Sequence, residues 1–163
     1  MYLEDTPLDV GYASERISVK EKKSAKESVL GGQNGKTQLL ISVPFIDDAV
    51  KEELLEIEKE LPSKGEHEVT ASLILAEEPE DDPKLGKIKL FIDDKEEFAD
   101  FYGTRLSGEP FEGGITKAVI LISKDGAIFY DEFMTDLNER FNQETLLRKI
   151  YAAQTCYTGK GCH

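Results

Sequence analysis

Two cysteines near the end of the chain are the residues whose chemistry is most easily specified. Cys156 and Cys162 are the only cysteines, and both lie in the stretch CYTGKGCH (156–163). Five residues separate them, and Gly159 and Gly161 make the connection flexible enough for the two sulfurs to close a disulfide. The spacing differs from a Cys-x-x-Cys redox motif. The pair is therefore a redox candidate with three open readings: a reversible disulfide, a structural disulfide, or two free thiols.

The same stretch is one ligand short of a closed zinc site. Cys156, Cys162 and His163 offer two thiolates and one imidazole, whereas a structural zinc ion takes four ligands. His67 is the only other histidine, and it completes the set only if the fold brings it to the tail. Because the spacing matches no metal motif, we predict no metal and no cofactor.

Acidic residues dominate the charge of the chain. The net charge is −13, and residues 47–100 alone hold 19 acidic and 7 basic residues. A phosphate backbone would be repelled by this region, so we expect no nucleic-acid partner. The acid excess is typical of a solvated face that keeps a protein in solution.

Membrane insertion and secretion are not indicated. The longest apolar runs, at 39–43 and 118–122, are far too short to cross a bilayer. The N-terminal residues lack the basic region and apolar stretch of a secretory signal. We therefore expect a cytoplasmic protein that has no membrane partner.

The apolar pattern predicts one α/β domain over residues 37–154. Its expected strands are 37–43, 68–76, 88–92, 117–123 and 127–133, and its expected helices are 47–61, 95–103 and 142–154. The segment 1–36 is polar and lysine-rich, so we expect a weakly ordered N-terminal arm. We expect residues 155–163 to form a separate tail that contains both cysteines.

Local signals support these elements. Asp47 or Asp48 is expected to cap the first helix, and Asp93 or Asp94 the second. Apolar side chains are expected to face the core of each helix: Val50, Leu54, Ile57 and Leu61 in the first, Phe98, Phe101 and Tyr102 in the second, and Leu146, Leu147, Ile150 and Tyr151 in the third. The Asp125-Gly126 turn predicts an antiparallel hairpin.

The order of elements predicts a βαβ unit followed by a ββα unit. A right-handed crossover makes the first two long strands parallel neighbours, and the tight turn makes the last two antiparallel. This arrangement indicates a thioredoxin-like fold, with a mixed β-sheet covered by helices on both faces.

Four stretches resemble the atypical thiol peroxidases, a branch of the peroxiredoxins. They are GKTQLLISVPFIDDAV (35–50), FYGTRL (101–106), EPFEGGITKAVILISKDGAIFYDEF (109–133) and NQETLLRKI (142–150). Together they cover about residues 35–150, and their order and spacing carry the resemblance. It implies the peroxiredoxin fold.

The residues that the resemblance places at the active site depart from the family pattern. It implies a peroxidatic cysteine in the first turn of the first helix, a threonine three residues earlier, and an arginine from the hairpin. Here these positions carry Lys51, Asp48 and Lys117. The resolving cysteine is also missing, because the acidic loop 77–87 stands in its place. An amine has no accessible two-electron oxidation and return, so Lys51 cannot do the work of a thiolate.

Three functions remain open. The first is a thiol peroxidase-related protein that lacks the peroxidatic cysteine and acts as a non-catalytic binding or regulatory partner. The second is a thiol–disulfide relay that uses Cys156 and Cys162. The third is a peroxidase in which these tail cysteines fold back over the pocket near Asp48 and Lys117.

The resemblance also implies partners. The family commonly pairs as homodimers, and by resemblance Phe111 and Tyr102 are the expected apolar contacts. A thioredoxin-type protein or another protein is the other expected partner. Lys51 and Lys117 could also form a small-anion or ligand site, whereas the simplest interpretation of Lys51 is an exposed lysine paired with a neighbouring carboxylate.

Overall fold

The computed structural model describes residues 2–4, 6–7, 9–21, 26–62, 69–134 and 136–155. Within them the chain forms a seven-stranded mixed sheet of order β3-β2-β6-β5-β4-β8-β9 and a two-stranded sheet of β1 and β7. The strands are β1 (Tyr2–Leu3), β2 (Ile17–Glu21), β3 (Glu27–Leu30), β4 (Thr37–Ser42), β5 (Val69–Leu75), β6 (Ile88–Ile92), β7 (Leu106–Ser107), β8 (Ala118–Ile122) and β9 (Ile128–Phe133). The helices are α1 (Asp48–Glu60), α2 (Glu97–Tyr102) and α3 (Gln143–Thr155).

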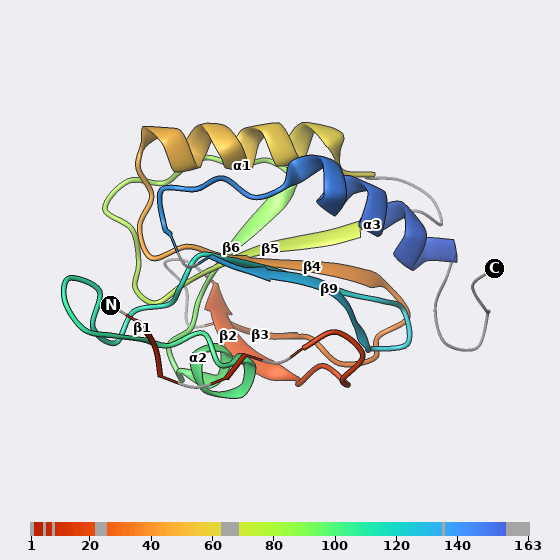
Figure 1. Cartoon of the computed structure of the whole chain (residues 1–163), viewed down its shortest axis with the longest axis horizontal. Helices are drawn as coiled ribbons and strands as arrows, with labels where there is room; N and C mark the ends of the chain where they lie inside the picture. The colour runs from red at the N-terminus through yellow and green to blue at the C-terminus, as the bar shows by residue number, and fades with distance from the viewer. Residues whose placement is uncertain are drawn as a thin grey trace.

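Helices cover both faces of the large sheet, as predicted. Figure 1 shows α1 and α3 side by side over one face and α2 under the other. One core cluster joins buried residues of α1 and α3 to β4, β5 and β8, and a second joins α2 to the opposite face. The central strand β4 is buried along its whole length, because both of its faces are covered.

Strand pairing follows the predicted topology. β4 and β5 are parallel neighbours, with Thr37 opposite Val69. β8 and β9 pair antiparallel across the turn at Gly126, whose φ of 87° is a conformation that glycine adopts at low cost. The sheet is therefore mixed, with α1 as the crossover that carries the chain from β4 to β5.

The N-terminal region differs from the expectation of weak order. β2 and β3 form a hairpin in which Ile17 lies opposite Leu30, and β2 extends the sheet by pairing with β6. Ile17 and Val19 are buried against α2. The expectation was wrong for these strands, because their stability comes from pairing with a strand about 70 residues away rather than from a strong local pattern. The division into arm, domain and tail stays a prediction.

Two aromatic side chains lie on the solvent face of their helices, contrary to expectation. Phe101 of α2 is 46% exposed and Tyr151 of α3 is 59% exposed. In each helix only one stripe of side chains faces the sheet. Phe98 and Tyr102 form this stripe in α2, and Leu146 and Ile150 form it in α3. Neither Phe101 nor Tyr151 lies on that stripe.

Tyr102 is in the core and cannot be a dimer contact. It is fully buried, stacks on Phe98 with ring centroids 5.2 Å apart, and donates its hydroxyl hydrogen to the carbonyl of Glu15 at 2.6 Å. Burial raises the pKa of this phenol, so it stays a hydrogen-bond donor at neutral pH. The prediction that Tyr102 contributes to an interface was therefore wrong.

None of the described helices combines the length and the apolar character that a membrane span requires.

Candidate functional site

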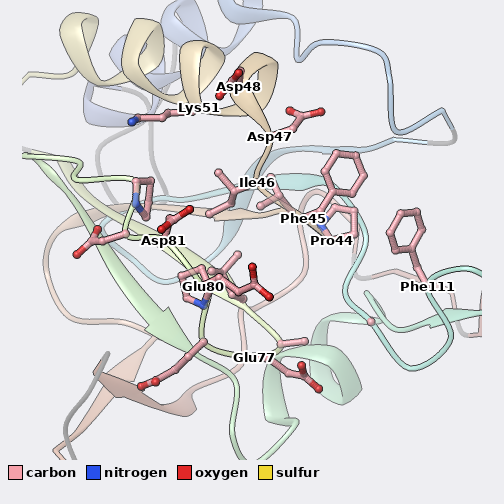
Figure 2. A pocket seen from close by; sticks show the side chains of 18 of the residues that line it. Pro44, Phe45, Ile46, Asp47, Asp48, Lys51, Glu77, Glu80, Asp81 and Phe111 are labelled. Carbon is pink, nitrogen blue, oxygen red and sulfur yellow. The ribbon is translucent and has the colours of Figure 1, made fainter.

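A pocket of about 600 Å³ opens at the N-terminal end of α1. Three segments line it, namely residues 43–48, 75–83 and 111–114, together with Lys51 of α1. Figure 2 shows the start of α1 on one side of this space and the acidic loop on the other. The pocket thus lies where the β4 and β5 strands end, at the edge of the sheet from which α1 departs.

The sequence at 44–50 explains how the pocket wall is built. Pro44 and the residues after it break the strand, and Asp47 then caps α1 as predicted. Its carboxylate accepts a hydrogen bond from the Val50 amide at 2.8 Å. Val50 is buried and fixes the helix against the sheet, so the first turn of α1 faces the pocket in a defined position.

Lys51 and Asp48 both line the pocket. Asp48 is exposed and Lys51 is half-buried. Figure 2 shows the Lys51 side chain extending away from the carboxylates of Asp47 and Asp48. Lys51 forms no ion pair with any residue in the described part of the chain, so the expected pairing with a neighbouring aspartate is absent from the described contacts.

The pocket is strongly negative. Eight carboxylates line it, and Lys51 is the one basic residue among the described lining residues. Five of the carboxylates come from the acidic loop: Glu77, Glu78, Glu80, Asp81 and Asp82. Carboxylates of this loop stand across the pocket from the helix, as Figure 2 shows for Glu77, Glu80 and Asp81. Such a field repels anions and attracts cations.

An aromatic pair forms another part of the wall. Phe45 and Phe111 stack with their ring centroids 5.4 Å apart and their planes 23° from parallel. Both are half-buried, so apolar ring surface remains open to the pocket. Phe111, expected at an interface, is thus part of the pocket wall.

Lys117 lies apart from the pocket, in the protein interior. It is 3% exposed and does not line the cavity. Its Nζ lies 2.7 Å from Oε1 of Glu53 and donates to the carbonyl of Glu139 at 2.6 Å. It also lies 4.9 Å from the centroid of the Phe141 ring. Of the three positions that the resemblance assigned to the active site, Asp48 and Lys51 therefore line the pocket. The third, Lys117, forms a buried ion pair instead.

Glu53 is a residue that the sequence reasoning missed. It is 2% exposed, and its second oxygen accepts a hydrogen bond from the Phe141 amide at 2.6 Å. A signal was present, because Glu53 follows Val50 by three residues and precedes Ile57 by four. These spacings place a carboxylate on the apolar face of α1, where it needs a buried cation.

The tail residues Cys156, Cys162 and His163, and also His67, lie outside the described residues. The redox and metal hypotheses attached to them therefore stay predictions. Within the described residues, no group of three or more histidine, cysteine, aspartate or glutamate side chains could hold a metal ion.

The charge of the pocket lining determines which groups it can hold. A thiolate that attacks peroxide needs a positive environment, which lowers the thiol pKa and stabilises the developing anion. The described pocket contains no sulfur, and its carboxylates outnumber its cations. An amine, a guanidinium or another cation with an apolar portion matches this lining.

Comparisons with known proteins relate the chain to the thiol peroxidases. A thiol peroxidase of Campylobacter jejuni is 27% identical, with the match covering 99% of this chain and 93% of that protein. A peroxiredoxin-like protein of Aquifex aeolicus has a TM-score of 0.82 at 19% identity, covering 93% of this chain and 91% of that one. A thiol peroxidase of Chromobacterium violaceum has a TM-score of 0.75 at 15% identity, covering 94% and 91%. No protein-family model matches the chain.

These similarities agree with the fold built above. The solved structures confirm the predicted thioredoxin-like α/β fold of the peroxiredoxin type. The match to the curated thiol peroxidase covers 99% of this chain, so the similarity includes the hairpin of β2 and β3 as well as the elements that follow it.

Proposed function

We propose that this chain is a non-catalytic binding or regulatory protein on a thiol peroxidase scaffold, with Lys51 at the position of the peroxidatic cysteine. The observation that carries the proposal is the composition of the pocket at the start of α1. Residues 1–155 contain no cysteine, and eight carboxylates line the pocket to which Lys51 contributes.

Electrostatics supports a loss of peroxidase chemistry at this pocket. Cleavage of the peroxide bond by a thiolate puts negative charge on the leaving oxygen, and a cation must stabilise it. Asp48 and the acidic loop would raise the energy of that charge. Lys117 cannot help, because its ammonium group is buried and already bound by Glu53 and Glu139.

The competing function is redox chemistry by Cys156 and Cys162, which are the only thiols in the chain. It takes the form of a thiol–disulfide relay, or of a peroxidase that uses the tail. Both forms require the two thiols to be oxidised and reduced reversibly, which the first function does not.

Peroxide consumption followed by stopped flow, with a thioredoxin system as reductant and thiol titration before and after, separates these functions. We expect no consumption above the buffer rate and an unchanged thiol count. The matched control is the variant Cys156→Ser/Cys162→Ser. Consumption that disappears in this variant would overturn the proposal, and a reversible loss of two thiols without consumption would favour the relay.

The remaining proposals concern assembly and location. We keep the homodimer, a thioredoxin-type or other protein partner, and a cytoplasmic location as proposals. Phe111 retains a place in the dimer proposal because it is half-buried and borders the pocket, whereas Tyr102 is removed from it by its burial. Sedimentation of the full chain over a range of concentrations tests the dimer.

A further inference from the structure

Four of the pocket carboxylates lack a partner in the described part of the chain. The side chains of Asp48, Glu77, Glu80 and Asp81 form no ion pair or hydrogen bond with any other described residue. All four are exposed at the pocket rim, on two facing walls. Because Lys51 is the one described cation in the lining, a ligand that enters the pocket meets these four carboxylates in a field that is negative.

The pocket also offers aromatic surface, which can contact a flat cation. The half-buried rings of Phe45 and Phe111 stack on each other and line the same cavity. A guanidinium group stacks on an aromatic face and donates paired hydrogen bonds to carboxylates, whereas an ammonium group does neither as well. Aromatic rings next to unpaired carboxylates therefore favour arginine.

The spread of the carboxylates argues against a metal ion. They stand on opposite walls of a cavity of about 600 Å³ rather than converging on one point. Among the described residues no three of them are close enough to hold a metal ion. A volume in the range of ordinary ligand pockets fits an extended peptide segment that brings charge and apolar surface together.

We infer that the pocket at the start of α1 is a docking site for a segment of a partner protein that carries arginine next to an apolar side chain. The argument is charge complementarity: arginine guanidinium groups pair with Asp48 and with the acidic loop, and the apolar side chain covers Phe45 and Phe111. The inference rests on the proposed binding function and names the chemistry of the partner.

Binding of a defined probe tests this site. The probe is a fluorescein-labelled, N-acetylated and C-amidated peptide of sequence Gly-Arg-Leu-Arg-Gly, and fluorescence anisotropy is measured with the full chain at low salt. We expect saturable binding that weakens roughly tenfold in Glu77→Gln/Glu80→Gln/Asp81→Asn, because rim charges set the attraction. Phe111→Ala should weaken binding about threefold or more through the loss of ring contact.

A control triple variant separates the site from net charge. Glu52→Gln/Glu60→Gln/Asp94→Asn removes the same number of charges from exposed carboxylates outside the pocket. We expect this variant to bind within about twofold of the unmodified chain at the same ionic strength. An equal loss of affinity in both triple variants would mean that the peptide is attracted by the net charge of the protein rather than by the pocket. This result would overturn the inference.

Two further outcomes would also overturn it. The first is the absence of saturable binding by the full chain. The second is full displacement by spermine together with no effect of Phe111→Ala, which would assign the pocket to small polycations. The readout does not depend on turnover. A chain that consumes peroxide and still binds the probe would refute the proposed function while leaving the docking site in place.

Discussion

At the scale of single residues, Lys117 and Glu53 form a buried ion pair that holds the protein interior together. Both side chains are almost completely buried, and every oxygen of the carboxylate has a partner. Two charges removed from water are tolerated only when each satisfies the other, so neither residue can change alone without a large penalty.

We predict that Lys117→Met destabilises the protein by about 3–5 kcal/mol, because it leaves the Glu53 carboxylate buried without a cation. The double variant Lys117→Met/Glu53→Leu should recover a large part of this loss. Urea unfolding measures both. Lys51→Met is the matched control and should change the stability by less than about 0.5 kcal/mol, since Lys51 has no described ion pair. A double variant as unstable as the sum of the single variants would contradict the prediction.

The residue scale also shows what the sequence could and could not predict about the site. Asp47 was predictable as a helix cap, because the signal is local. The place of Asp48 and Lys51 in the first turn of α1 was predictable for the same reason, since both closely follow the cap. The burial of Lys117 was not, because its partners Glu53 and Glu139 come from distant parts of the chain.

At the scale of elements, the long segments were predicted well and the short ones less so. The stripe of Val50, Leu54 and Ile57 in α1 and the run of β4 have a clear period, and both are found as expected. The hairpin of β2 and β3 has only two apolar residues per strand, so its formation depends on the pairing with β6. The hydrophobic period of a segment does not predict its pairing with a strand that is distant in the sequence.

The edge strand β9 carries a carboxylate in an unfavourable place. Asp131 lies opposite the buried Ile120, and its Oδ2 is buried with no hydrogen-bond partner in the described structure. Burial, followed by the nearby charge of Asp9, raises the pKa of this carboxyl to about 6. Since this pKa lies above the value of 3.8 in the unfolded chain, the folded state binds the proton more tightly and loses stability as the pH rises from about 4 to about 6.

We therefore predict that Asp131→Asn stabilises the protein by about 1–2 kcal/mol at pH above about 7, a value reduced for the partial exposure of the side chain. The gain should disappear below about pH 4, where the aspartate of the unmodified chain is protonated in both states. Urea unfolding across this pH range measures it. Asp94→Asn, at an exposed position, should leave the pH dependence unchanged. A gain that persisted at low pH would point to a cause other than ionisation.

At the scale of the whole molecule, the charge is the property that the fold organises. The net charge of −13 is concentrated in residues 47–100, and the fold brings the acidic loop of that region to face the N-terminal end of α1. The excess of acidic residues could be predicted from the composition. That these residues gather on two sides of one pocket could not be predicted, because this depends on the crossover between β4 and β5.

This gathering should make the stability of the protein depend on salt. Repulsion among like charges destabilises the compact state, and added ions screen it. We predict that the Tm rises by several degrees between about 20 and about 300 mM NaCl, where the screening length falls steeply. Glu77→Gln/Glu80→Gln/Asp81→Asn should raise the Tm at low salt and flatten this dependence.

The control triple variant Glu52→Gln/Glu60→Gln/Asp94→Asn tests whether the pocket carboxylates cause the salt dependence of the Tm. It changes the net charge by the same amount as the pocket variant. If the charges act through their closeness in the pocket, the control should retain most of the salt dependence, because repulsion between charges falls off within about one Debye length. Equal flattening in both variants would mean that total charge, rather than its arrangement, sets the stability. Differential scanning calorimetry of the three proteins at the two salt concentrations measures this difference. If the pocket carboxylates repel one another at low salt, a cationic partner that binds there should stabilise the folded protein.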